Sequence, residues 1–108
     1  MTNKNLKIAK EIITEEIRKS GLILDRITLF GSRARDNFSK DSDWDFLIIV
    51  NEEFNWDVRW ALSANIRMKL VYSGMPADII IVSDKQFQER KKDVGHIVYY
   101  AIKEGLQV

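Results

Sequence analysis

The 108-residue chain has the length of one small domain, and 45% of its residues are hydrophobic, enough to form a core. Its 17 basic and 16 acidic residues leave a net charge of +1, so no overall charge draws it to nucleic acid or to a membrane surface. It contains no cysteine, which excludes a disulfide framework and a thiolate metal site. We therefore expect one soluble, cytoplasmic domain over residues 1–108, with no signal peptide, membrane span or direct nucleic-acid site.

The first part of the chain predicts a helix followed by a strand. Apolar residues recur at helical spacing over residues 4–20, and Gly21 follows as a helix end. Residues 23–24 are expected to form a short bridge, and the polar pair after them a turn into a strand over residues 27–30. After that strand, residues 33–36 favour a short helix.

The rest of the chain alternates between apolar runs and helical patterns. Asn55 is a candidate N-cap, and Ser83 with Gln86 forms a capping box. The expected elements, in order, are a strand over 45–50, a helix over 56–72, a strand over 77–82, and helices over 84–92 and 94–103. Three strands surrounded by helices predict an α+β (or α/β) two-layer domain.

The turn after the first strand has the features of a phosphate-binding loop. Gly31 leaves room for a ligand close to the backbone, and amides at the start of the following helix favour an anion. Ser32 adds a hydroxyl donor, and Arg33 and Arg35 add guanidinium groups suited to phosphate. Arg35 has an alternative role, because it could pair with a carboxylate such as Asp36 or Asp41. The glycine-rich patterns of P-loop and dinucleotide-binding folds do not occur.

Two aspartates stand at the start of the second predicted strand. Side chains alternate along a strand, so Asp43 and Asp45 are expected on one face and Trp44 on the other. Two neighbouring carboxylates repel each other and need a compensating cation, for which magnesium is the simplest candidate. Asp78 is a third carboxylate, placed just before the third apolar run.

Each of these residues also has an ordinary structural interpretation. A single aspartate before a strand is often only a turn or cap residue. His96 is expected at the surface or at the core edge rather than in catalysis. Trp56 and Trp60 lie one helical turn apart, and they could form a partner-binding patch or fasten the long helix to the sheet. Of Tyr99 and Tyr100, one is expected in the core and the other exposed.

The combination of these motifs resembles a known family. Gly31-Ser32, ten further residues, the segment Asp43-Trp44-Asp45-Phe46 and a later apolar-flanked Asp78 resemble the signature of the DNA polymerase β-type nucleotidyltransferase superfamily. The size of the chain and its closing residues 100–105 resemble the minimal nucleotidyltransferase (MNT) branch. The resemblance implies a polymerase β-like fold with a small mixed sheet flanked by helices, two magnesium ions and a nucleoside triphosphate.

The resemblance also implies roles for residues and a partner. Asp43 and Asp45 would hold both ions and the triphosphate, while Asp78 would hold the catalytic ion and help to deprotonate the attacking hydroxyl. Gly31 and Ser32 would hold the terminal phosphates, with Arg33 assisting. MNT proteins often pair with a HEPN-domain toxin in a hetero-oligomer, and the MNT antitoxin transfers AMP from ATP to a HEPN tyrosine.

Two other functions stay open at this point. The first is nucleotidyl transfer to a small molecule such as an aminoglycoside, although a domain this small has little chain left to build an acceptor pocket. The second is an inactive antitoxin that only binds its partner, against which the intact set of three aspartates argues.

Overall fold

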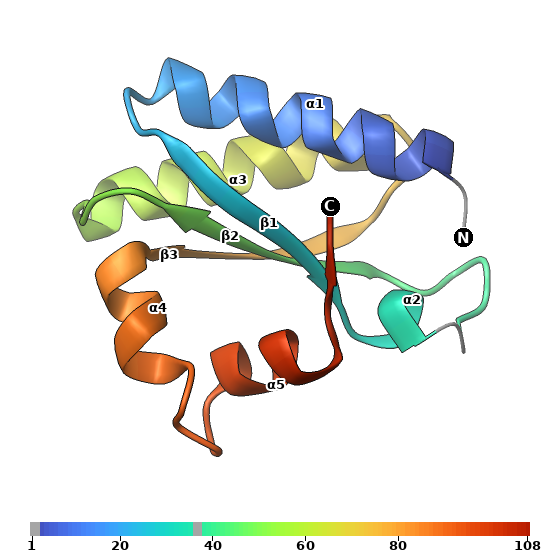
Figure 1. Cartoon of the computed structure of the whole chain (residues 1–108). Coiled ribbons are helices and arrows are strands. Elements are labelled where there is room, and N and C mark those ends of the chain that lie inside the picture. Colours follow the sequence, from blue (N-terminus) through green and yellow to red (C-terminus); the bar gives the residue numbers. More distant parts are fainter. Residues whose placement is uncertain (1–2, 36–37) are drawn as a thin grey trace.

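The computed structural model describes residues 3–35 and 38–108, and within them five helices accompany one sheet of four strands (Figure 1). No helix of this described part combines the length and the apolarity needed to cross a membrane. The elements follow the chain as α1 (Asn3–Lys19), β1 (Leu24–Phe30), α2 (Ser32–Arg35), β2 (Trp44–Val50), α3 (Trp56–Tyr72), β3 (Ala77–Ser83), α4 (Asp84–Arg90), α5 (Ile97–Glu104) and β4 (Leu106–Gln107).

The sheet is mixed, with the spatial order β3-β2-β1-β4. β1 runs antiparallel to both of its neighbours, β2 and β4, whereas β2 and β3 are parallel. Parallel strands need a crossover connection, and α3 provides it between β2 and β3. In this strand order β3 lies at one edge of the sheet.

Alternate side chains of β2 enter two separate cores, one on each face of the sheet. On one face the β2 residues Phe46, Ile48 and Val50 pack in the core that buries apolar residues of α1 and α3. On the other face Leu47 and Ile49 pack with apolar residues of α4 and α5. The predicted α+β class with a mixed sheet flanked by helices is confirmed, and the helices lie on both faces, so there is one more helical layer than predicted (Figure 1).

The caps predicted from the sequence are present. The Asn55 side chain accepts a hydrogen bond from the amide of Val58 at 2.8 Å. Ser83 accepts from the amide of Gln86, and the Gln86 side chain accepts in return from the amide of Ser83, both at 3.1 Å. These contacts fix where α3 and α4 leave the sheet.

Some element boundaries differ from the prediction, and β4 is an additional strand. β1 already begins at Leu24, which pairs with Val50, and the irregularity between Leu24 and Arg26 is a bulge within the strand rather than a turn before it. α5 begins at Ile97, since His96 is its N-cap and accepts from the amide of Val98 through Nδ1. β4 was not predicted, because two residues carry no periodic signal. Asp36, placed in the predicted short helix, lies outside the described residues.

Candidate functional site

Two of the three predicted carboxylates lie side by side because of the strand register. Asp45 of β2 is paired with Asp78 of β3 in the parallel ladder. Both side chains project from the face that carries Leu47 and Ile80, because alternate residues of a strand share a face. On the other side of β2, Asp45 is paired with Phe30, the last residue of β1, so the glycine turn follows directly beside it. The site lies at the end of the sheet near α2 (Figure 1).

The charges around Asp45 favour its protonated form in the ligand-free protein. Burial, followed by the negative charges of Asp78 and Asp43, raises the pKa of Asp45 to about 6. The guanidinium of Arg35 acts in the opposite direction and lowers that pKa. Asp43 is exposed, directly before β2, and is close enough to act on Asp45. Asp45 is thus half-buried between two carboxylates, a place where a bound cation would be stabilised.

Trp44 confirms the predicted alternation at the start of β2. Its side chain is only 2% exposed and belongs to the core on the α1 and α3 face, opposite the carboxylates. Its amide donates to the carbonyl of Pro76 at 2.9 Å, which starts the β2–β3 ladder. The buried indole therefore anchors the strand that carries Asp45.

Gly31 packs directly against the carboxylate of Asp45. It has a φ of 75°, a conformation that favours glycine, and a Cβ added there would overlap Asp45 Oδ2. Its carbonyl accepts from the amides of Ala34 and Arg35 at 3.1 and 3.2 Å, which closes the α2 turn. Ser32, the first residue of α2, is half-buried beside it. The loop thus brings backbone groups next to the acidic pair.

The guanidinium of Arg33, for which a phosphate-binding role is predicted, is engaged within its own loop. It is buried, and its guanidinium donates to the carbonyl of Ser42 at 2.9 and 3.2 Å and to that of Lys40 at 3.3 Å. The same group lies 4.4 Å from the ring centroids of both Phe38 and Trp44. These contacts hold the segment before β2 against α2. We therefore infer that Arg33 positions the loop, and its role at the phosphates stays a prediction.

Arg35 is the cation that this loop leaves near the acids. It is exposed, and its Nη1 donates to Glu104 of α5 at 2.9 Å, whereas Asp36 lies outside the described residues. Its positive charge lowers the pKa of Asp45, so Arg35 acts electrostatically on the acidic site. A sequence signal for this difference existed, because residues two apart on a helix lie on nearly opposite faces and only one of two such arginines can point outward.

The carboxylates of Asp43, Asp45 and Asp78 are donors of the type that binds a hard divalent cation, although they do not form a complete coordination site. Among the described residues, no three acidic, histidine or cysteine side chains stand close enough together to ligate one ion. Asp45 and Asp78 nevertheless share one ladder position, and burial together with the charges of Asp78 and Asp43 raises the pKa of Asp45. Carboxylate oxygens are the ligands that magnesium prefers. Asp43 and Asp78 are both exposed, so their carboxylates are accessible from solvent.

Trp56 and Trp60 of α3 point away from the sheet. Trp56 and Trp60 are 69% and 65% exposed, and their rings stack at 5.7 Å. They therefore do not fasten α3 to the sheet, and that alternative is wrong. Tyr99 is half-buried and Tyr100 exposed, close to the prediction.

A mixed sheet with a glycine turn beside paired carboxylates, flanked by helices, defines a polymerase β-like nucleotidyltransferase fold. The sequence profile of the nucleotidyltransferase domain family matches residues 10–103, and the chain belongs to that family. The protein is thus a nucleotidyltransferase. No curated protein matches the chain.

Solved structures show the same fold. A putative nucleotidyltransferase from Sulfolobus solfataricus has a TM-score of 0.62 and 24% identity, over 96% of this chain and 78% of its own. A toxin-antitoxin structure with AMP-PNP has a TM-score of 0.57 and 19% identity, over 91% and 70%. A structure of a tri-AMPylated Shewanella oneidensis HEPN toxin in complex with MNT antitoxin matches with a TM-score of 0.53 and 18% identity. The match covers 95% of this chain and 70% of the other.

Replacing Gly31 should cost more than replacing Gly74, which serves as a matched control. Both glycines have a left-handed φ, 75° and 80°, but a Cβ at Gly74 meets nothing within 4 Å. Gly74→Ala should therefore lose only the backbone cost, about 1–2 kcal/mol of the free energy of unfolding. Gly31→Ala should lose more of the free energy of unfolding, because the added Cβ would displace the Asp45 carboxylate. The same displacement should abolish nucleotide binding. Urea denaturation and calorimetry with ATP and magnesium measure both effects, and equal behaviour of the two variants would contradict the placement of Gly31.

Asp45→Asn should stabilise the ligand-free protein at pH 7 but not at pH 4. The pKa of Asp45 is about 6 in the folded state, above its ordinary value of 3.8, so the folded state binds the proton more tightly. The free energy of unfolding of the wild type should fall as the pH rises from 3.8 to about 6. Above pH 6 the loss of stability caused by ionising Asp45 is complete. Urea denaturation at the two pH values measures it, with Asp41→Asn on the exposed turn as control. An equal gain at both values would show that the effect is not electrostatic.

Proposed function

We propose that the protein is a cytoplasmic MNT antitoxin that transfers AMP from ATP to a hydroxyl group of a protein partner, a tyrosine of a HEPN toxin. The observation that carries the proposal is the Asp45–Asp78 pair in ladder register beside Gly31. Two structures of the same fold support it, one of a toxin-antitoxin with AMP-PNP and one of a tri-AMPylated HEPN toxin in complex with MNT antitoxin.

Magnesium belongs to this proposal. Asp43, Asp45 and Asp78 would hold the ions, of which we expect two, because they are the hard oxygen donors grouped at this end of the sheet. When bound, the ions would neutralise the negative charge of the triphosphate and of the leaving pyrophosphate.

The residues of the chain itself would bind and orient the substrates. Backbone and hydroxyl groups of Gly31 and Ser32 would receive the terminal phosphates, and Arg35 would add a guanidinium after leaving Glu104. The acceptor hydroxyl forms a bond to the α-phosphorus of ATP while the bond to pyrophosphate breaks. The exposed carboxylate of Asp78 would accept the hydroxyl proton.

The position of the acids favours a protein acceptor over a small one. Asp78 is exposed and stands at the start of the edge strand, where a large molecule can approach. The cavity of about 500 Å³ beside β3 is lined by none of the three carboxylates, so it is not a closed acceptor chamber around them. Transfer to a small molecule such as an aminoglycoside therefore remains the second candidate, and partner binding without catalysis the third.

Arg35 and Arg33 should behave differently when each is changed to alanine. Arg35→Ala removes an exposed cation, so it should weaken ATP binding about 10-fold or more and leave the stability almost unchanged. Arg33→Ala leaves two carbonyl acceptors without their buried donor and should cost about 1–3 kcal/mol of stability. Calorimetry with ATP and thermal unfolding separate the two. The reverse pattern would return the phosphate role to Arg33.

Asp78→Asn tests the transfer itself. The variant keeps the shape of the side chain, and its fold should survive because carboxylate repulsion is relieved. AMP transfer should fall by orders of magnitude, while binding to the partner persists. Intact-mass measurement of HEPN-domain proteins of the source organism, each incubated with ATP, magnesium and either protein, records the adduct, and a pull-down records the complex. Asp41→Asn is the control. An undiminished adduct with Asp78→Asn would overturn the catalytic assignment.

A further inference from the structure

The edge strand β3 has backbone groups that no other strand uses. The amide of Trp44 donates to the carbonyl of Pro76, and the parallel register then continues without a shift to Val50 and Ser83. In a parallel ladder, residues of one strand alternate between bonding to the neighbour and pointing away from it. This geometry directs the amide and carbonyl groups of Ile79 and Ile81 away from β2, toward the open edge. Among the described residues, no side chain or loop forms a hydrogen bond with them.

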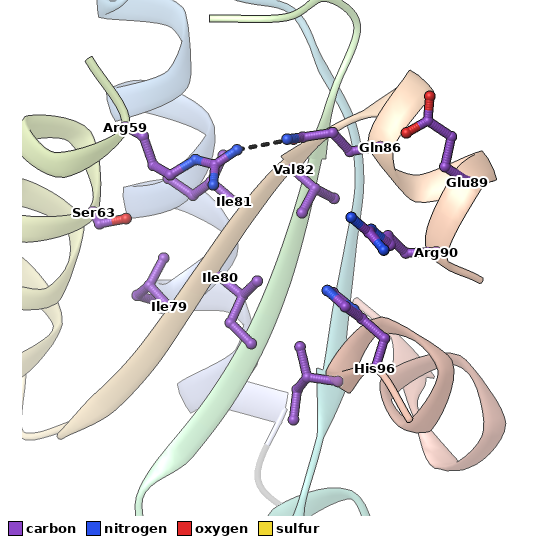
Figure 2. A pocket seen from close by; sticks show the side chains of 11 residues that line it. Arg59, Ser63, Ile79, Ile80, Ile81, Val82, Gln86, Glu89, Arg90 and His96 are labelled. Atoms are coloured by element: carbon purple, nitrogen blue, oxygen red, sulfur yellow. Dashed lines mark hydrogen bonds between the residues drawn. The ribbon is translucent and has the colours of Figure 1, made fainter. Parts of the chain in front are cut away.

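A groove lies over this edge (Figure 2). It has a volume of about 500 Å³, and residues 79–82 of β3 form its floor. Arg59 and Ser63 of α3 line one side, and Arg90 of α4 and His96 line the other. The open backbone groups thus lie at the bottom of a trough between helices that belong to opposite faces of the sheet.

A hydrogen bond between Arg59 and Gln86 spans one end of the groove, and the other end lies beside Asp78 in the chain. Nη2 of Arg59 donates to Oε1 of Gln86 at 2.9 Å, a bridge from α3 to α4 across the edge (Figure 2). Gln86 is itself held by the amide of Ser83, the last residue of β3. The opposite end of the floor is Ile79, which directly follows Asp78.

The rim of the groove favours negative charge. Arg59 bonds to a neutral amide, and no carboxylate of the described residues forms an ion pair with it. Arg90 pairs only with exposed Asp93, at 3.6 Å. Glu89 is the one acidic residue lining the groove within the described part of the chain. A partner that carries acidic side chains therefore complements this surface.

We propose that the groove docks an extended, acidic segment of the protein that receives AMP, added to the sheet as a strand on β3. The amides and carbonyls of Ile79 and Ile81 would form its main-chain hydrogen bonds. Side chains directly opposite each other on paired strands share a face. A residue of the added strand opposite Asp78 would therefore project toward the acidic pair, so docking would also position the acceptor. This inference rests on the proposed function.

A second copy of the chain fits the groove less well than a different protein. Pairing of β3 with β3 would bring two cationic rims together, with Arg59 and Arg90 of each copy facing those of the other. A partner protein also accounts for the neighbouring surface of α3. There a hollow of about 90 Å³ is lined by Trp60 and shares Ser63 with the groove, so the exposed indole can anchor the same partner.

Hydrogen exchange followed by NMR tests the docking. In the free protein the amide of half-buried Ile79 should exchange quickly. That of Ile81, which is only 2% exposed, should exchange more slowly, but still faster than the amides of Ile80 and Val82, which are bonded to β2. Addition of a HEPN-domain protein of the source organism that accepts AMP should slow exchange at Ile79 and Ile81. Unchanged exchange at both amides in a complex that still transfers AMP would overturn the docking site and leave the proposed function standing.

Two variant pairs complete the test by measuring the dissociation constant of the complex. Ile79→Pro removes an outward donor at a sheet edge, where proline is tolerated, and should weaken the complex at least 10-fold, whereas Ile79→Val keeps the donor and the affinity. Arg59→Glu should weaken it similarly, with Lys7→Glu on α1 as the charge-matched control. Unchanged affinity of both Ile79→Pro and Arg59→Glu would refute the docking. The absence of complex and adduct with every HEPN-domain protein would refute the proposed function, and the docking with it.

Discussion

The ladder pairing of Asp45 with Asp78 is the constraint on which the site depends. Two carboxylates at one ladder position repel each other, and burial together with this repulsion raises the pKa of Asp45. The strands cannot slip to relieve it, because a shift of one residue would turn the apolar side chains of β2 from one core into the other. The fold therefore holds the acids together by burying both faces of the central strand.

The glycine loop depends on the same carboxylate. Gly31 touches Asp45 where no side chain fits, so the turn can follow β1 without a gap between the loop and the acids. Buried Arg33 then holds the segment before β2 through two carbonyls and two aromatic rings. Arg33 is thus buried in the loop that it shapes, whereas Arg35 is exposed and pairs with Glu104.

Elements that have a periodic or capping signal in the sequence could be predicted. Elements whose position depends on contacts between distant residues could not. The α3 helix, its Asn55 cap and the Ser83 capping box follow from local chemistry and are confirmed. The strand β4 and the early start of β1 depend on pairing with distant residues, which no local pattern shows. The two-residue spacing of Arg33 and Arg35 indicates that they point apart, but only the contacts of Arg33 with Phe38 and Trp44 show which of them lies inside.

The two paired acids occupy different positions in the sheet, and this difference suits a large acceptor. Asp45 lies on the central strand and is half-buried, so its environment is set by the protein itself. Asp78 lies on the edge strand and is exposed, so its environment is completed by whatever approaches that edge. Unpaired edges invite association, and folded proteins usually protect them. Here the edge lies in a trough with charged walls, which admits a single strand but hinders the pairing of two whole sheets. Under the proposed function, Asp78, the second residue of this strand, would be placed for chemistry on another polypeptide.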